Sequence, residues 1–396
     1  MSTPNPCLPL ENRILLQALR LDDGSAAALR RMLSEPLDWA RLRDLALTHG
    51  VQPLIYARLR DVAPDLVPHA EMRAQRGQFV YNGQRNLRLT GRLLKLLSAL
   101  SEREISALAL KGPALAIQAY GDLALRDFAD LDLLVPREAL ARTFDILDEQ
   151  GYAATPPLGS AAANDKLKAD SELHFRAGDV HIDVHWRPIE RFLPLAVDLE
   201  RWRTNSITID LLGRPVPTLA PEDALLYLSI NGLRDGWCSL KTIVDLAHLC
   251  QAAPDAAHAQ LWDQAERIGA RRIVALGLSL ASHVVGVDLP PVSLRYLESD
   301  EAVTILVNEA ASRLTLELVD GATAYALFRR ARERLRDRIA CRLTPGPRDW
   351  AVVELPASLD PLYYLIRPLR LGGSLLRRSW RTAGRLVHGR LSTHHS

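Results

Sequence analysis

The 396-residue sequence predicts an α+β fold, with a small mixed β-sheet flanked by an N-terminal and a C-terminal helical lobe. Apolar residues recur every three or four positions across residues 12–103, which is the period of amphipathic helices. Short apolar or alternating runs follow between residues 105 and 210, and these are typical of strands. Helical periodicity returns at Pro221. The predicted parts are an N-terminal helical lobe at 1–103, a sheet core at 104–220, a C-terminal helical lobe at 221–345 and a basic tail at 346–396.

The N-terminal lobe ends in a long predicted helix over residues 69–102. One apolar stripe of this helix is formed by Leu87, Leu94, Leu97 and Leu100. Upstream, His49-Gly50 ends an earlier helix, because glycine readily takes the left-handed conformation that closes helices.

Composition excludes several classes of protein. The formal net charge of +2 gives no strong overall case for nucleic acid or an anionic membrane as a partner. Four cysteines without metal-finger spacing are expected to be thiols in a reducing compartment. No signal peptide and no apolar run of membrane-spanning length is predicted, so we expect a cytoplasmic protein.

Two carboxylates mark the predicted strand at residues 130–135. Side chains at i and i+2 of a strand point to the same face, so Asp130 and Asp132 should stand side by side, with Leu131 and Leu133 facing the core. Adjacent carboxylates repel each other, and a pair of them usually has a compensating cation. Mg²⁺ is the natural partner of ligands that are all oxygen.

A predicted hairpin, 172–176 and 180–186 around a Gly-Asp turn, supplies a third carboxylate. His181, Asp183 and His185 share one face of its second strand. If that strand lies beside the Asp-x-Asp strand, the three carboxylates converge as two-metal phosphoryl transfer requires, and Asp183 can take the acceptor proton. The alternative is a His-x-Asp-x-His site for a transition metal.

The turn at Lys111-Gly112 joins a predicted strand to a predicted helix, a place that favours anions. Gly112 would allow close backbone approach, and Lys111 would add a point charge for phosphate. Lys111 as a surface lysine is the alternative. Arg126 would contact phosphate or tie its loop to the carboxylates, or it would be a structural partner of Asp127 or Asp130.

One further acid lies on the otherwise apolar predicted helix over residues 240–250. We expect Asp245 to have a packing or capping partner, because a buried acid needs one.

These motifs together resemble the uncharacterised bacterial nucleotidyltransferase family, which has the DNA polymerase beta superfold. The resemblance covers roughly residues 35–250. It is carried by Lys111-Gly112, Arg126-x-x-x-Asp130-x-Asp132-Leu-Leu-Val, Gly151-Tyr152, Ile182-Asp183-x-His185-Trp186 and flanking segments around His49-Gly50-Val51 and Pro221-Glu222-Asp223.

The resemblance implies a transferase that uses Mg²⁺ and a nucleoside triphosphate, with ATP as the first choice. It would move a nucleoside monophosphate to an unidentified acceptor and release pyrophosphate. Carried over by position, the catalytic and metal-binding residues are Asp130, Asp132 and Asp183. The residues that we assign to nucleotide binding are Lys111, Gly112, Arg126 and His185. The sequence departs from the wider superfamily at Pro113, where a Ser or Thr hydroxyl would contact phosphate, and has Asn231 where family members commonly have His.

Two other functions stay open. The chain would be a nucleotide-binding scaffold if Pro113 prevents efficient transfer. It would be a membrane or RNA adaptor if the arginine-rich tail, which has no acidic residue after Asp360, provides the contact. For the enzyme, the acceptor is a small molecule, a peptide or a protein.

Overall fold

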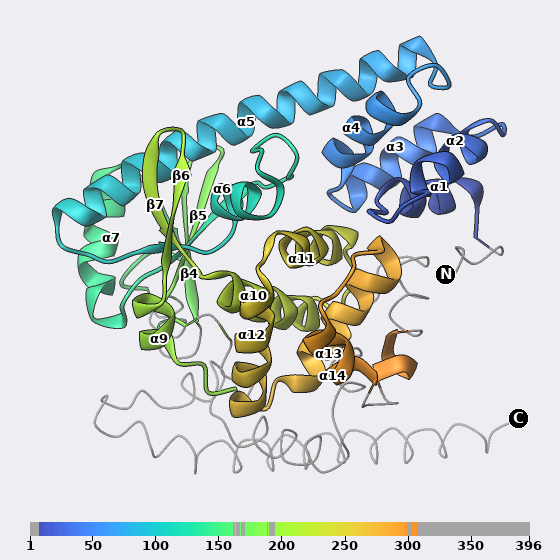
Figure 1. Ribbon diagram of the computed structural model, residues 1–396. Helices are drawn as coiled ribbons and strands as arrows, with labels where there is room; N and C mark the ends of the chain where they lie inside the picture. The colour runs from blue at the N-terminus through green and yellow to red at the C-terminus, as the bar shows by residue number, and fades with distance from the viewer. Residues whose placement is uncertain are drawn as a thin grey trace, which may run out of the picture. The chain divides into compact units, whose positions relative to one another are not determined.

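The protein is described here from a computed structural model (Figure 1), which describes residues 8–160, 163, 167, 171–187, 189, 195–298 and 303–307. The chain divides into two compact units. The first consists of Met1–Thr155, His174–Ile189 and Leu195–Phe328, and the second of Pro156–Leu173, Glu190–Pro194 and Arg329–Ser396. The predicted basic tail at 346–396 lies outside the described residues.

The N-terminal part of the first unit is helical, as its sequence period predicts. Its helices are α1 Leu10–Ala18, α2 Ser25–Leu33, α3 Trp39–Thr48, α4 Gln52–Val62 and α5 His69–Glu102. At 1.5 Å per residue α5 is about 50 Å long, and it packs against α4 and also against the sheet strands β2 and β7. Figure 1 shows α5 running along the sheet and on to α4. The long helix predicted at 69–102 is confirmed.

The sheet has seven strands in the order β3-β4-β5-β2-β1-β7-β6. The strands are β1 Leu108–Ala109, β2 Asp130–Leu134, β3 Ala153–Thr155, β4 Glu172–Ala177, β5 Val180–His185, β6 Ile207–Leu211 and β7 Arg214–Thr218. β2 is parallel to β5 and antiparallel to β1, while β1 is parallel to β7. The predicted mixed sheet and α+β class are confirmed.

Strand β7 was not expected, because prolines usually exclude a segment from a sheet. It contains Pro215 and Pro217 and pairs along its length with β6. Its pairing with β1 is confined to Ala109 and Thr218. The prolines therefore lie where β7 has one neighbouring strand, β6. On its other side no strand needs a hydrogen bond from the N–H groups that proline lacks.

Helices connect the strands and then continue to the end of the described chain. The connecting helices are α6 Gly112–Leu115, the π-helix η1 Ala116–Tyr120, the 3-10 helix η2 Arg137–Ala139, α7 Leu140–Glu149 and α9 Leu199–Thr204. The C-terminal helices are α10 Pro221–Arg234, α11 Leu240–Ala252, α12 Asp255–Ile268, α13 Arg271–Leu280, the π-helix η3 Ala281–Val285 and α14 Pro291–Glu298. Helix α10 packs against α11, α12 and α13.

Trp237 closes the core of the C-terminal helices. Its side chain is fully buried, and it holds a backbone φ of 56° that is unusual for a residue other than glycine. A Cβ at Gly232 would lie 2.4 Å from the Trp237 ring, and one at Gly277 would lie 2.8 Å from it. The two glycines are therefore required so that α10 and α13 can approach the indole.

Two smaller expectations were also tested. Cys238 and Cys250 are thiols, as predicted, whereas Cys7 and Cys341 lie outside the described residues. Within the described part of the chain, no helix has the length and apolar character needed to cross a membrane.

Candidate active site

The register between β2 and β5 places the predicted carboxylates on neighbouring strands. Asp132 lies opposite Asp183, and Asp130 lies opposite His181. Residues opposite each other on neighbouring strands point to the same face of the sheet. The expectation that the hairpin strand lies beside the Asp-x-Asp strand is thus confirmed, and the three carboxylates share one face.

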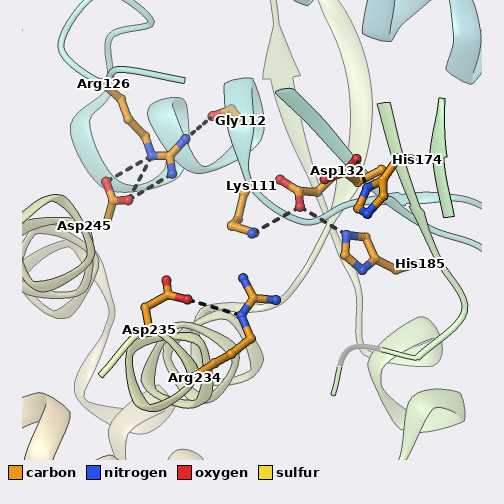
Figure 2. Close-up of polar contacts among 10 residues, drawn as sticks. Lys111, Gly112, Arg126, Asp132, His174, His185, Arg234, Asp235 and Asp245 are labelled. Atoms are coloured by element: carbon orange, nitrogen blue, oxygen red, sulfur yellow. Dashed lines mark hydrogen bonds and ion pairs between the residues drawn. The ribbon is translucent and has the colours of Figure 1, made fainter. Parts of the chain in front are cut away.

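Asp132 is the buried member of the three, with 5% of its surface exposed. Two cationic or polar groups approach one of its oxygens (Figure 2): Lys111 Nζ lies 3.1 Å and His185 Nε2 lies 3.1 Å from Asp132 Oδ1. Burial alone would raise the pKa of Asp132, but the Lys111 charge and the His185 contact outweigh it and hold this pKa far below its usual range. Asp132 is therefore ionised at neutral pH.

Asp130 is electrostatically different. Among the residues that the structure describes, none forms a hydrogen bond or an ion pair with its carboxylate. Burial and the charge of Asp132 raise the pKa of Asp130, with a further contribution from Asp183, and the charges of Lys111 and Lys241 oppose this rise without cancelling it. The charged form of this carboxylate is therefore less favoured than that of an ordinary aspartate.

Asp183 contacts a histidine from the other strand of its own hairpin. His174 Nδ1 lies 2.8 Å from Asp183 Oδ1. His181 is exposed, and His185 turns to Asp132 instead of joining Asp183. In the alternative transition-metal site, Asp183 and His185 therefore contact different groups and His181 is exposed. His174 was missed at the sequence level, although its position on the facing strand of a predicted hairpin could have indicated it.

Gly112 lets the turn after β1 approach the Asp-x-Asp strand. Its φ is 55°, and a Cβ added there would lie 3.3 Å from the backbone oxygen of Asp130. Both the left-handed conformation and this close approach favour glycine. Lys111 is part of the same turn and also lies 5.6 Å from the centre of the Tyr227 ring. The lysine is therefore held inside the site between Asp132 and Tyr227 and is not a surface lysine.

Arg126 forms a buried ion pair on the other side of this turn (Figure 2). Its Nη2 lies 2.9 Å from Asp245 Oδ2, and its Nε lies 3.0 Å from Asp245 Oδ1. Tyr120 donates to Asp245 at 2.7 Å, and Arg126 Nη1 donates to the carbonyl of Gly112 at 3.4 Å. The expected partner for Asp245 is confirmed.

The partners suggested for Arg126 at the sequence level, Asp127 and Asp130, were wrong. Asp127 pairs with Arg85 of α5, and Arg126 pairs with Asp245. The physical reason is distance along the chain: Asp245 is 119 residues away and reaches Arg126 only because α11 packs against η1. A contact of Arg126 with phosphate stays a prediction.

Helix α5 anchors the loop that carries Arg126. Asn86 Nδ2 donates to the carbonyls of Leu123 and Arg126 at 2.7 and 2.8 Å, and Asn82 Nδ2 donates to Ala124 at 3.1 Å. Sequence reasoning missed both residues. A signal was present, because asparagine is unfavourable inside helices and two of them four residues apart on one helix face indicate a polar contact.

The donor types of the three carboxylates are compatible with a magnesium ion. The three carboxylates offer only oxygen ligands, which Mg²⁺ prefers, and none of the described residues forms an ion pair with Asp130. Within the described residues, no three or more His, Cys, Asp or Glu side chains are already gathered as a ligand group. Metal binding would therefore require the Asp132 and Asp183 side chains to adjust.

The comparison with protein families agrees with the motifs. Residues 35–286, more than half of the chain, match the family described as uncharacterised nucleotidyltransferase. The chain belongs to this family. The resemblance inferred from the sequence motifs is confirmed, and membership supports nucleotidyl transfer as the general class of activity.

Two further comparisons were made, with solved structures and with curated proteins. The solution structure of antibiotic-resistance factor ANT(2'')-Ia is similar with a TM-score of 0.35 and 16% sequence identity, over 47% of this chain and 95% of that chain. No curated protein matches the sequence.

Proposed function

We propose that this protein is a Mg²⁺-dependent nucleotidyltransferase that moves a nucleoside monophosphate from a nucleoside triphosphate, ATP first, to an acceptor. The observation that carries the proposal is the β2–β5 register. It sets Asp183 opposite Asp132 and on the same face as Asp130, in a chain of a nucleotidyltransferase family. The acceptor is a small molecule, a peptide or a protein side chain.

In the proposed reaction, an acceptor oxygen attacks the α-phosphorus in line with the leaving group. The bond between the α-phosphorus and the oxygen that bridges to the β-phosphate breaks, and pyrophosphate leaves. Asp183 accepts the acceptor's proton. His174, at 2.8 Å, holds the Asp183 carboxylate in position for that transfer.

Asp130, Asp132 and Asp183 are the residues that would hold Mg²⁺. The ion, when bound, would lower the pKa of the acceptor hydroxyl and stabilise the charge that develops on pyrophosphate. His185 would keep Asp132 oriented through its 3.1 Å contact. Lys111, which contacts Asp132 through its ammonium group, would contact a phosphate oxygen when the nucleotide is bound.

The test is release of pyrophosphate from each labelled triphosphate in the presence of Mg²⁺ and pooled acceptors. Asp130→Asn is the decisive variant, because this carboxylate has no partner among the described residues and its loss should leave the fold intact. Asp148→Asn, an exposed acid on α7, is the matched control. If wild type, Asp130→Asn and Asp148→Asn release pyrophosphate equally, the proposed site is wrong.

A nucleotide-binding scaffold is the second candidate. It is favoured by Pro113 at the start of α6 and by the Lys111 contact that occupies Asp132. Triphosphate binding without turnover across a wide acceptor screen would support this function over the enzyme. The adaptor function depends on the basic tail, and deletion of residues 361–396 would abolish partner or membrane binding if it is correct.

A further inference from the structure

Lys241 is a second lysine beside the site, and sequence reasoning did not single it out. It is the second residue of α11 and stands one turn before Asp245. Residues four apart share a helix face, so Lys241 lies on the face that carries Asp245 towards Arg126 and η1. The helix N-terminus, with its partial positive charge, is at the same end.

The aliphatic part of Lys241 is held by the N-terminal helices. A Cβ added at Gly50 would lie 3.1 Å from Lys241 Cδ, and Gly50 has a φ of 65°. The turn between α3 and α4 therefore packs directly on the lysine stem. This packing restricts where the ammonium group can go.

The ammonium group itself has no bonded partner among the residues that the structure describes. In the described part of the chain, nothing forms a hydrogen bond or an ion pair with it, although the residue is only partly exposed. Burial lowers the pKa of Lys241, and the charge of Arg126 lowers it further. The neighbouring carboxylates of Asp245, Asp127 and Asp130 oppose this effect without cancelling it.

Two of those three carboxylates are already satisfied. Asp245 is paired with Arg126, and Asp127 is paired with Arg85. Asp130 is the remaining carboxylate. Lys241 and Asp130 each shift the pKa of the other, but they form no ion pair. A ligand that carries both signs, with a cation for Asp130 and an anion for Lys241, would satisfy both at once. A complex of a divalent cation with a polyphosphate has this character.

We propose that Lys241 binds the β- and γ-phosphates of the donor nucleotide, the part that leaves as pyrophosphate. The inference rests on the proposed function for the identity of the donor, and it names a phosphate-binding residue outside the sheet core. The N-terminal helices, through Gly50, position this residue.

The experiment measures binding of inorganic tripolyphosphate with Mg²⁺ to the full chain by calorimetry. Lys241→Gln should weaken this binding about tenfold or more, because it removes a charged hydrogen-bond donor. Lys95→Gln, an exposed lysine on α5, should change it less than about twofold. AMP binding should stay within about twofold for both variants, since AMP lacks the β- and γ-phosphates.

The two proposals can fail separately. Tripolyphosphate binding that depends on Lys241, in a protein without turnover, would support this inference and contradict the enzyme. Turnover with equal tripolyphosphate affinity in Lys241→Gln and Lys95→Gln would overturn the inference alone. Absence of tripolyphosphate binding to the wild type would also overturn it.

Discussion

Two sets of charged and polar side chains near the candidate site are organised in opposite ways. The closed cluster consists of Arg126, Asp245 and Tyr120, which bond to one another at 2.7–3.1 Å. Arg126 and Asp245 are 5% and 2% exposed. The open pair consists of Asp130 and Lys241, which lack any bonded partner among the described residues.

We infer from this difference in bonding that the closed cluster has a structural role and that the open pair binds a ligand. A buried ion pair is costly to break, because removing one partner leaves an uncompensated buried charge. An unpaired charge at a partly accessible position lowers stability in the ligand-free protein and gains a partner on binding. The closed cluster should therefore govern folding, and the open pair should govern activity.

Removing the Asp130 carboxylate should have the largest effect on activity and should not lower stability. Asp130→Asn should reduce pyrophosphate release by roughly 10²–10³-fold, the size found when one charge-stabilising group is lost from an active site. Its free energy of unfolding should equal or exceed that of the wild type, because the raised pKa of Asp130 means that its ionised form is disfavoured in the fold. Urea denaturation measures the second quantity. A destabilised variant would contradict the comparison.

Breaking the closed cluster should act on stability. Asp245→Asn should lower the free energy of unfolding by about 3–5 kcal/mol, because it leaves the Arg126 guanidinium buried without a counter-charge. The control is Arg88→Met, which removes an exposed pair with Asp179 and should change stability by less than about 1 kcal/mol. Similar losses in the two variants would mean that the buried pair is not structural.

The pH dependence of stability should report on the surroundings of the closed cluster. His248 lies 4.4 Å from the Tyr120 ring, and burial lowers its pKa to about 4, against the charge of Asp245. The unfolded chain binds a proton near pH 6.5 and the folded chain does not, so stability is complete above pH 6.5 and falls as the pH drops towards 4.

His248→Gln should remove roughly 1–3 kcal/mol of the acid destabilisation between pH 6.5 and pH 4. Denaturation at several pH values measures it. His69→Gln, at an exposed histidine, is the control. An unchanged slope in His248→Gln would show that another group causes the acid sensitivity.

The smallest effect on ligand affinity is expected at Gly50, and it tests whether the position of Lys241 matters for binding. Gly50→Ala and Gly269→Ala place a Cβ on residues with similar φ, 65° and 74°, and should each cost about 1–2 kcal/mol of backbone strain. Of these two glycines, Gly50 is the one beside Lys241; among the described residues, nothing lies within 4 Å of a Cβ at Gly269. Tripolyphosphate binding should weaken about two- to fivefold in Gly50→Ala and stay unchanged in Gly269→Ala. Equal tripolyphosphate affinities in the two variants would show that the turn at Gly50 does not position Lys241 for binding.

Much of the fold and half of the site can be read from local patterns. The helical period predicts α5, and the alternation around a Gly-Asp turn predicts β4 and β5. Asp130, Asp132 and Asp183 could be singled out because strand geometry fixes which side chains share a face. Lys111-Gly112 could be found as a strand-to-helix turn. In each case the signal lies within a single helix, strand, hairpin or turn.

The partners of these residues could not be predicted in the same way. Whether Arg126 meets Asp127 or Asp245 depends on how α11 packs on η1, and whether Lys241 is solvated or enclosed depends on Gly50, nearly two hundred positions earlier. The β7 strand with its prolines depends on having one neighbour along most of its length. Backbone periodicity is a local property, so short segments encode it. Charge compensation is set by distance in space and by burial, and these exist only once remote segments have packed together.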